Sequence, residues 1–175
     1  FGISVCGLRA LDIGASTGGF TDCLLSRGAA QVTAVDSGHG QLSARLAADS
    51  RVRSLEGMNA RYLSAAEVGA GYDIAVMDVS FISQTLILPV IPALLRDGGE
   101  LVSLIKPQFE VGRADVGKGG IVRSAAARER AVTAVRTAAD AVGLKCCGVI
   151  TSPIQGGDGN TEYLAHFRRA ATTGK

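Results

Sequence analysis

A glycine-rich turn between an apolar run and a helical pattern constrains this chain more than any other feature. The segment 8–28 reads LRALDIGASTGGFTDCLLSRG. Its first part, residues 8–13, has the apolar character of a strand, and apolar residues recur at helical spacing after Gly19. Glycine has no Cβ, so such a turn can bend sharply and a ligand can approach its backbone. The helix that follows offers free N–H groups at its N-terminus, and the segment therefore predicts a strand–turn–helix ligand site.

The spacing of these glycines separates the two kinds of cofactor that lie over such a turn. Dinucleotide sites use Gly-x-Gly-x-x-Gly, whereas this turn has Gly14-x-x-x-Gly18-Gly19 and lacks the middle glycine. Asp12, which ends the expected strand, would repel a pyrophosphate. The same carboxylate suits the cationic methionine end of S-adenosylmethionine, which is the cofactor that we expect here.

Two further strand ends carry polar residues that suit a nucleoside. Residues 31–36 predict a second strand that ends in Asp36, whose carboxylate can accept hydrogen bonds from both ribose hydroxyls. A third strand over 51–55 is followed by Asn59, whose amide can read an adenine edge. The simpler alternative is that Asp12, Asp36 and Asn59 only form turns at strand ends.

The order of the predicted elements indicates the fold class. Strands alternate with helices along most of the chain, which indicates a mostly parallel α/β sheet with helices on both faces. The last two strands are joined by a short turn-rich loop, so we expect an antiparallel hairpin at the C-terminus. The expected fold is a seven-stranded, Rossmann-like, S-adenosylmethionine-dependent methyltransferase fold. Its strands are expected over 8–13, 31–36, 51–55, 72–78, 100–105, 144–152 and 163–167.

Three longer helices are expected outside the glycine turn. Residues 38–49 predict one helix, with Leu42 and Leu46 on one face. Residues 86–95 predict another, either continuous or broken by its two prolines, before an exit turn over 96–99. A long amphipathic helix is expected over 124–142, with Ser124 as its N-cap.

Length and composition fit one domain, expected over residues 1–170, followed by a flexible tail over 171–175. The chain has 175 residues, of which 47% are hydrophobic, which is enough for a proper core. Its net charge is only +2 and it contains no Trp, so any binding of nucleic acid must depend on a local basic patch or on another domain.

The cysteines and the apolar runs indicate the compartment. The four cysteines form no C-x-x-C pair and no zinc spacing, so we expect no metal site and a reducing, cytoplasmic setting. The longest apolar run, residues 86–95, falls far short of the about 20 residues that span a membrane.

A carboxylate and an amine follow two neighbouring strands of the predicted sheet. In open parallel sheets ligands bind beyond the carboxyl ends of the strands, where Asp78 and Lys106 would lie close together. Such a pair has three readings: a surface salt bridge, an anion site, or a desolvated lysine that takes a proton from a hydroxyl. Glu162 would join the pair if the last strand returns to this edge.

The segment 112–120, GRADVGKGG, nearly matches a phosphate-binding loop. Gly119 stands where that motif needs a hydroxyl for Mg²⁺, and the segment is not expected between a strand and a helix, so we reject a nucleotide triphosphatase. We expect instead a mobile, basic substrate flap that carries Arg113, Lys118 and Arg123. A plain solvated loop is the alternative.

Seven motifs together resemble the TlyA family of FtsJ-like ribosomal RNA 2′-O-methyltransferases. The resemblance covers nearly the whole chain. The motifs are DIGASTGGF (12–20), RGAA (27–30), GHGQL (38–42), DVSFIS (78–83), KPQFE (106–110), GKGGIV (117–122) and NTEY (160–163) after Ser152-Pro153.

The resemblance implies methyl transfer from S-adenosylmethionine to the ribose 2′-hydroxyl of cytidines in 16S and 23S ribosomal RNA. Asp78, Lys106 and Glu162 match the last three members of the family's Lys-Asp-Lys-Glu tetrad, with Lys106 as the proton acceptor, tuned by the other two. The residues that match cofactor-binding positions are Asp12, Gly14, Ala15, Ser16, Thr17, Gly18, Gly19, Phe20, Asp36, Asn59 and Asp78.

The sequence departs from the family pattern in ways that concern partners. The first lysine of the tetrad is expected upstream of Phe1, together with an N-terminal S4 RNA-binding domain. Ribosomal subunits would then be held mainly by that domain and by the loop with Arg113, Lys118 and Arg123. Position 39 is His where the family usually has Tyr. The oligomeric state and the target nucleotide stay open.

Three rival functions are considered. Members of the family are also described as haemolysins, although the sequence has no membrane span or basic amphipathic helix. A cofactor-binding module without catalysis is a second rival, and the three tetrad residues argue against it. A small-molecule methyltransferase is the third, and the tetrad favours a ribose hydroxyl instead.

Overall fold

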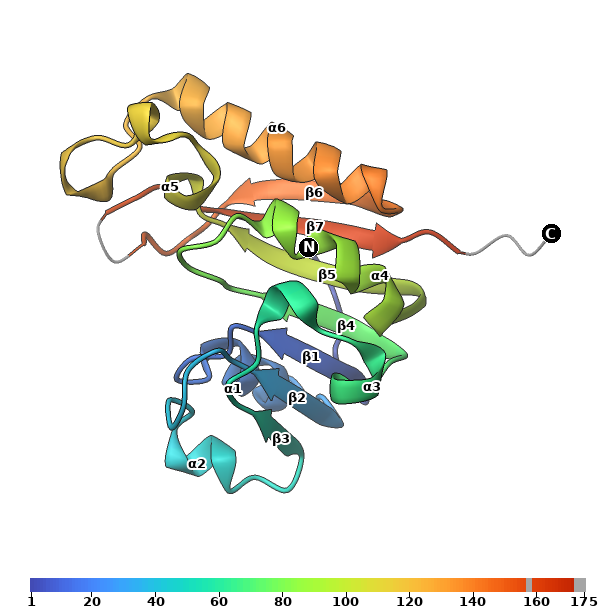
Figure 1. The fold of residues 1–175 in the computed structure, drawn as a ribbon. Helices are drawn as coiled ribbons and strands as arrows, with labels where there is room; N and C mark the ends of the chain where they lie inside the picture. The colour runs from blue at the N-terminus through green and yellow to red at the C-terminus, as the bar shows by residue number, and fades with distance from the viewer. Residues whose placement is uncertain (157–158, 172–175) are drawn as a thin grey trace.

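The computed structural model describes residues 1–156 and 159–171 and contains one seven-stranded sheet. The strands are β1 (Arg9–Ile13), β2 (Gln31–Val35), β3 (Val52–Leu55), β4 (Tyr72–Met77), β5 (Leu95–Ile105), β6 (Leu144–Thr151) and β7 (Tyr163–Arg169). Their order across the sheet is β3-β2-β1-β4-β5-β7-β6 (Figure 1).

The pairing confirms the expected α/β architecture. Strands β1 to β5 pair in parallel, and β7 pairs antiparallel with both β5 and β6. Strand β4, with the sequence YDIAVM, is buried along nearly its whole length, as expected for a strand that is covered on both faces. The carboxyl ends of the parallel strands therefore meet at one edge of the sheet, which is the left edge in Figure 1.

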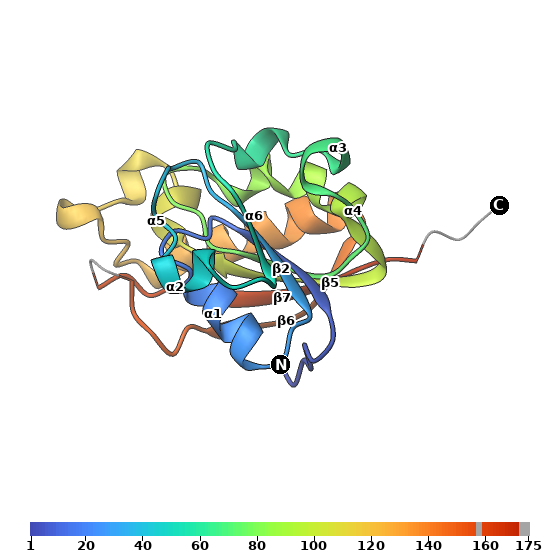
Figure 2. The ribbon, with the colours of Figure 1, turned by 90° about the horizontal axis from the view of Figure 1, so that it is seen from below.

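Helices cover both faces of the sheet. Figure 2 shows α1 (Gly19–Ser26) on one face and α3 (Ala65–Val68), α4 (Ile91–Leu94) and α6 (Ala125–Ala141) on the other. The remaining short elements are α2 (Ala44–Ala47), α5 (Pro107–Glu110) and the 3-10 turns η1 (Ala60–Tyr62), η2 (Gln84–Leu86), η3 (Leu88–Val90), η4 (Arg113–Asp115) and η5 (Lys118–Gly120). No helix within the described ranges is both long enough and apolar enough to cross a bilayer.

Two hydrophobic cores lie on the two faces of the sheet. Leu24 and Leu25 of α1 pack with Val32 and Ile74 in the smaller core. The larger core joins residues of β4, β5 and β7 to the buried side of α6, such as Val135. Each large apolar side chain buried in this way contributes about 1.5–3 kcal/mol to folding. The two cores fix the strand order and thereby decide which loops meet at the carboxyl edge.

The predicted helix over 38–49 is wrong in extent, because only the single turn α2 forms there. The Gly38 amide donates to Asp36 Oδ1 at 2.7 Å, and Gly40 has a φ of +63°. A left-handed backbone cannot continue a right-handed helix, so residues 38–43 form a loop. The predicted apolar face survives, since Leu46 is buried against Gly18.

The segment over 86–95 is broken at its prolines, as one of the two alternatives predicts. It consists of η2, η3 and α4, with Pro89 and Pro92 in the first turns of the last two elements. The exit turn expected over 96–99 instead lies within β5. Leu95 pairs with Tyr72 and Glu100 pairs with Ile74, so residues 96–99 bulge out of the ladder.

The long helix is confirmed as α6, and the Ser124 hydroxyl accepts from the Ala127 amide at 3.2 Å, as an N-cap does. The predicted tail over 171–175 has residues 172–175 outside the described part of the chain. Residues 157–158 of the loop before β7 also lie outside it.

Candidate functional site

The glycine turn packs directly on the segment that follows β4. Gly14 has a φ of +82°, and a Cβ added there would lie 2.1 Å from the carbonyl oxygen of Asp78. Real Cβ atoms never approach an oxygen so closely, so this position requires glycine. The turn and the segment after β4 therefore form one wall.

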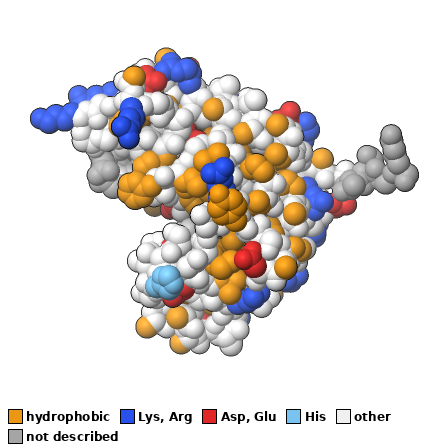
Figure 3. All heavy atoms as spheres, in the orientation of Figure 1, with side chains coloured by type: hydrophobic (Ala, Val, Ile, Leu, Met, Phe, Trp, Pro, Cys, Tyr) orange, Lys and Arg blue, Asp and Glu red, His pale blue; other side chains and the backbone are white. Residues whose placement is uncertain are grey.

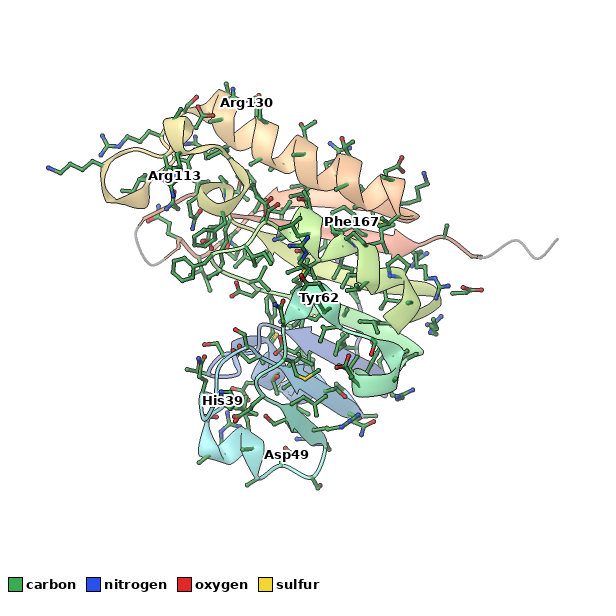
Figure 4. The ribbon with its side chains drawn as sticks, in the orientation of Figure 1. His39, Asp49, Tyr62, Arg113, Arg130 and Phe167 are labelled. Carbon is green, nitrogen blue, oxygen red and sulfur yellow. The ribbon has the colours of Figure 1, made fainter. Side chains whose placement is uncertain are left out.

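A cleft of about 690 Å³ opens along this wall, at the carboxyl ends of β1, β2 and β4. Figure 3 shows a notch on this side of the molecule, above the part that carries the histidine, and Figure 4 labels this histidine as His39. The predicted cofactor residues that line the cleft are Gly14, Ser16, Asp36, Asn59 and Asp78.

Asp36 holds two segments of the cleft together. Its Oδ2 accepts from the Ser16 amide at 2.8 Å, and its Oδ1 accepts from the Gly38 amide at 2.7 Å. A carboxylate has about four acceptor sites, so these bonds leave capacity for a ligand hydroxyl. The placement agrees with the predicted ribose contact, which stays a prediction.

Asn59 forms a turn contact and also lies in the cleft. Its side-chain oxygen accepts from the Arg61 amide at 3.0 Å and so caps η1, which is the ordinary turn role. The residue is also exposed and lines the cleft. Recognition of an adenine by this amide stays a prediction.

Asp12 lies behind the glycine turn and is completely buried. Thr21 Oγ1 donates to its Oδ2 at 2.6 Å, while its Oδ1 is buried without a hydrogen-bond partner. Burial raises the pKa of Asp12 to about 6, against the effect of the Thr21 hydrogen bonds and with smaller contributions from Asp78 and Asp36. A cation near the turn would act on this carboxylate through the electric field, because Asp12 does not line the cleft.

The other predicted cofactor residues divide into two groups. Ala15 and Gly18 are buried and Thr17 is exposed outside the cleft lining, so they shape the turn. Gly19 and Phe20 line a second cavity, on the other side of Asp78.

This second cavity has a volume of about 510 Å³. Its apolar wall includes Phe20, Leu104 and Leu164, and Asp78 lines it as well as the cofactor cleft. The full lining is Gly19, Phe20, Cys23, Asp78, Leu104, Lys106, Ser152, Pro153, Ile154, Gln155, Gly156, Glu162 and Leu164. The structure therefore brings all three predicted catalytic residues to one cavity.

Lys106 and Asp78 form an ion pair at the ends of adjacent strands. The Lys106 Nζ lies 2.6 Å from Asp78 Oδ1 and donates to Ser80 Oγ at 3.1 Å. The pair exists because β4 and β5 are hydrogen-bonded neighbours, with Met77 opposite Ser103. The lysine side chain is 15% exposed, so the ion pair is not a loose surface contact.

Glu162 reaches the same cavity from the loop before β7, as predicted. It is 6% exposed, and its Oε1 accepts from Gln108 Nε2 at 3.1 Å. A Cβ at Gly156 would lie 2.5 Å from Glu162 Oε1, so the loop before β7 packs closely over this carboxylate. Gln108, which sequence reasoning missed as a partner, lies in the KPQFE motif.

Sequence reasoning also missed several residues that line the cleft. Phe81 is the clearest, since it has a φ of +64° and its side chain is 90% exposed. A bulky residue in the left-handed region is strained, and such strain is concentrated at functional sites. Most of these missed residues lie in the family motifs over 38–42 and 78–83, which could have pointed to them. The missed residues are Ser37, Gln41, Gly57, Ala60, Val79, Ser80, Phe81 and Ile82.

The basic loop over 112–123 lies at the same edge of the sheet, where Figure 4 places Arg113. Its cations Arg113, Lys118 and Arg123 are all exposed. Buried Asn160 holds the loop, since its Nδ2 donates to the Gly120 carbonyl at 2.9 Å and its Oδ1 accepts from the Val122 amide at 3.0 Å. The loop forms η4 and η5 and does not connect a strand directly to a helix. This arrangement agrees with the rejection of a phosphate-binding loop. Its mobility stays a prediction.

Within the described ranges, no group of three His, Cys, Asp or Glu residues is placed to hold a metal ion. The four cysteines are unpaired thiols.

Comparison with known proteins gives close matches along the chain. A family model described as FtsJ-like methyltransferase matches residues 1–169. The chain is 47% identical over 168 residues to 16S/23S rRNA (cytidine-2'-O)-methyltransferase TlyA of Mycobacterium tuberculosis, covering 96% of this chain and 63% of that protein. It is 48% identical to Hemolysin A of Brachyspira hyodysenteriae, covering 95% of this chain and 70% of that protein.

Solved structures agree with these relatives. A putative hemolysin from Streptococcus thermophilus superposes with a TM-score of 0.92 at 47% identity, over 96% of this chain and 61% of that chain. N-methyltransferase NodS from Bradyrhizobium japonicum, in complex with S-adenosyl-L-homocysteine, superposes with a TM-score of 0.67 at 19% identity, over 94% of this chain and 79% of that chain. The second likeness shows a shared fold alone.

Proposed function

This chain belongs to the FtsJ-like methyltransferase family, and we propose that it transfers a methyl group from S-adenosylmethionine to a ribose 2′-hydroxyl of ribosomal RNA. The observation that carries the proposal is the position of Asp78. It lines both the cofactor cleft and the second cavity, and it lies 2.6 Å from Lys106. A donor in the cleft and a hydroxyl in the second cavity would meet beside these two residues.

The residues present fit S-adenosylmethionine. The Gly14 turn lets a ligand lie against backbone, Asp36 and Asn59 offer acceptors and an amide at the next two strand ends, and the unpartnered Oδ1 of Asp12 lies behind the turn. When bound, this cofactor supplies a methyl group activated by a positively charged sulfur. Gly14, Ser16, Asp36 and Asn59 would hold it.

Lys106 is the proposed proton acceptor. In its neutral form the amine nitrogen has a lone pair, takes the proton of the 2′-hydroxyl and leaves the oxygen nucleophilic. A lysine that enters the reaction with its proton must first release it to solvent. Asp78 and the Ser80 hydroxyl hold the nitrogen in place, and Glu162, held by Gln108, provides a second carboxylate in the same cavity.

The names of relatives support the class of substrate. TlyA of M. tuberculosis is named as a cytidine-2'-O-methyltransferase of 16S/23S rRNA, and we propose cytidine ribose in both RNAs as the target here. We propose that the protein acts in the cytoplasm, where ribosomal RNA is found. The chain spans 63% of the length of that relative. We further propose that an upstream S4 domain and the first lysine of the tetrad complete RNA capture, with Arg113, Lys118 and Arg123 contacting phosphates.

Transfer of labelled methyl from S-adenosylmethionine to purified 30S and 50S subunits tests this proposal. The chain is run beside a form extended upstream, each with a Lys106→Ala partner. Ribose labelling by the extended form that is lost in its Lys106→Ala partner supports the function. Cofactor binding without RNA labelling in any form contradicts it and favours a binding module.

A haemolysin function is a second candidate, because several similar proteins carry that name. Its test is lysis of red cells by the purified protein. Lysis that survives Asp78→Ala would separate this activity from methyl transfer, and the absence of lysis by wild type rejects it.

A further inference from the structure

One carboxylate joins the two segments that carry Asp78 and Lys106. Glu110, the last residue of α5, accepts from Ser83 Oγ at 2.6 Å through Oε2 and from the Gln84 amide at 2.8 Å through Oε1. Ser83 and Gln84 end the segment that starts at Asp78, and Glu110 ends the segment that starts at Lys106. The two segments are therefore joined at their far ends by Glu110, as they are joined at their near ends by the Lys106–Asp78 ion pair.

Strand β5 also holds the far end of the segment that starts at Asp78. Gln84 is 1% exposed, and its side chain bonds to Ser103 Oγ and to the Leu104 carbonyl, both on β5. Between the two ends the rings of Phe81 and Phe109 lie 5.1 Å apart. Contacts before and after Phe81 in the chain therefore hold its backbone in the left-handed region. A strained backbone persists only where the surrounding structure fixes it in this way.

Glu110 joins the two segments without lining either cavity. It is absent from the described linings of both the cofactor cleft and the second cavity. Burial raises its pKa, and the hydrogen bonds from Ser83 and Gln84 oppose that shift. Burying a carboxylate costs free energy, and the two hydrogen bonds offset that cost only while Glu110 faces Ser83 and Gln84.

We propose that Glu110 is a positioning residue for Lys106. By fixing the segment over 78–84 against α5, it keeps the Lys106 nitrogen between the Asp78 carboxylate and the Ser80 hydroxyl. Without it the segment relaxes toward an unstrained backbone and the distance between nitrogen and substrate hydroxyl is no longer fixed. The inference rests on the proposed function for its catalytic readout, but the placement of Lys106 can be measured separately.

The test compares Glu110→Ala and Glu110→Gln with a control, Glu129→Gln, in the complete protein. Glu129 is an exposed acid on α6, beside the groove between α6 and β6, and it lines neither of the two cavities. We expect Glu110→Ala to lower kcat on the order of a hundredfold, as a displacement of about 1 Å can do, with little change in KM for S-adenosylmethionine. Glu110→Gln keeps one acceptor for the Gln84 amide and should recover part of kcat, while Glu129→Gln should match wild type.

A readout without catalysis separates positioning from simple destabilisation. Crystal structures of the variants should show the Lys106 nitrogen displaced from Asp78 Oδ1 and Ser80 Oγ in Glu110→Ala and in its wild-type place in Glu129→Gln. Wild-type kcat and an undisplaced Lys106 nitrogen in Glu110→Ala overturn the inference. A displaced nitrogen in Glu110→Ala, when the wild-type protein labels no RNA, upholds the positioning role and rejects the proposed function instead.

Discussion

Asp78 and Lys106 lie 2.6 Å apart where two adjacent parallel strands end, and Asp78 is part of the wall of two cavities at once. This relationship connects a cleft suited to a nucleoside cofactor with a cavity that has an apolar wall and is also lined by Asp78, Lys106 and Glu162. A group-transfer reaction needs such a junction, because donor and acceptor must meet in one geometry.

Lys106→Ala should slow methyl transfer strongly while leaving cofactor binding nearly intact. The side chain accepts the proton in the proposed reaction, and loss of a general base costs about 10²–10⁴-fold. Single-turnover labelling of ribosomal subunits and calorimetric binding of S-adenosylmethionine measure the two effects. The control is Lys145→Ala, since Lys145 of β6 forms an exposed ion pair with Asp140 of α6. Equal losses in both variants would contradict the role of Lys106.

Gly14→Ala should destroy cofactor binding and lower stability together. The new Cβ would meet the Asp78 carbonyl at 2.1 Å, and a φ of +82° costs a residue with a side chain about 1–2 kcal/mol even without that clash. Thermal unfolding with and without cofactor measures both effects. Gly112→Ala is the matched control, because a Cβ there meets nothing within 4 Å. If cofactor stabilises Gly14→Ala as much as it stabilises wild type, the glycine turn does not pack closely on the segment after β4.

Asp12→Asn should remove a pH dependence of stability. Burial raises the pKa of Asp12 to about 6 from a usual value of 3.8, so the folded state binds this proton more tightly than the unfolded state. The stabilisation from the protonated carboxyl is complete below pH 3.8 and is lost as pH rises through about 6. A difference of this size between the folded-state and unfolded-state pKa values corresponds to about 3 kcal/mol of unfolding free energy.

Urea unfolding of wild type and Asp12→Asn from pH 4 to pH 8 measures this difference. Subtracting the two curves cancels the contributions of other titratable groups to the unfolding free energy. One of them is His166, whose pKa is lowered by burial, so its effect on stability has the opposite sign. Wild type should lose stability relative to Asp12→Asn between pH 4 and pH 7. A constant difference across this range would show that the Asp12 carboxyl titrates normally.

Asn160→Ala should release the basic loop. Its side chain makes both bonds that hold Gly120 and Val122, and each buried group left without a partner costs about 1–3 kcal/mol. We expect faster tryptic cleavage after Lys118 and Arg123 and weaker RNA binding, with S-adenosylmethionine binding unchanged. Asn160→Asp keeps the acceptor for Val122 and should give an intermediate cleavage rate. Cleavage as slow as in wild type would show that the loop is held by other contacts.

The parts of the fold that could be read from the sequence depend on local patterns. The turn from Gly14 to Gly19, the buried strand β4 and the Ser124-capped helix follow from residues a few positions apart, whose backbone preferences act without distant partners. The shared edge for Asp36, Asp78 and Lys106 could also be expected, because parallel strands bring their carboxyl ends to one side of a sheet.

Only the tertiary structure decided contacts between segments that are far apart in the chain. Asp12 fits a cofactor contact by its position in sequence, yet packing against Thr21 buries it behind the turn. Glu110 bonds to Ser83, and Asn160 bonds to Gly120 and Val122, because the strand order β4-β5-β7 places their loops together. Local preferences set each element, whereas the direction and partners of a side chain depend on the packed cores that fix how the elements meet.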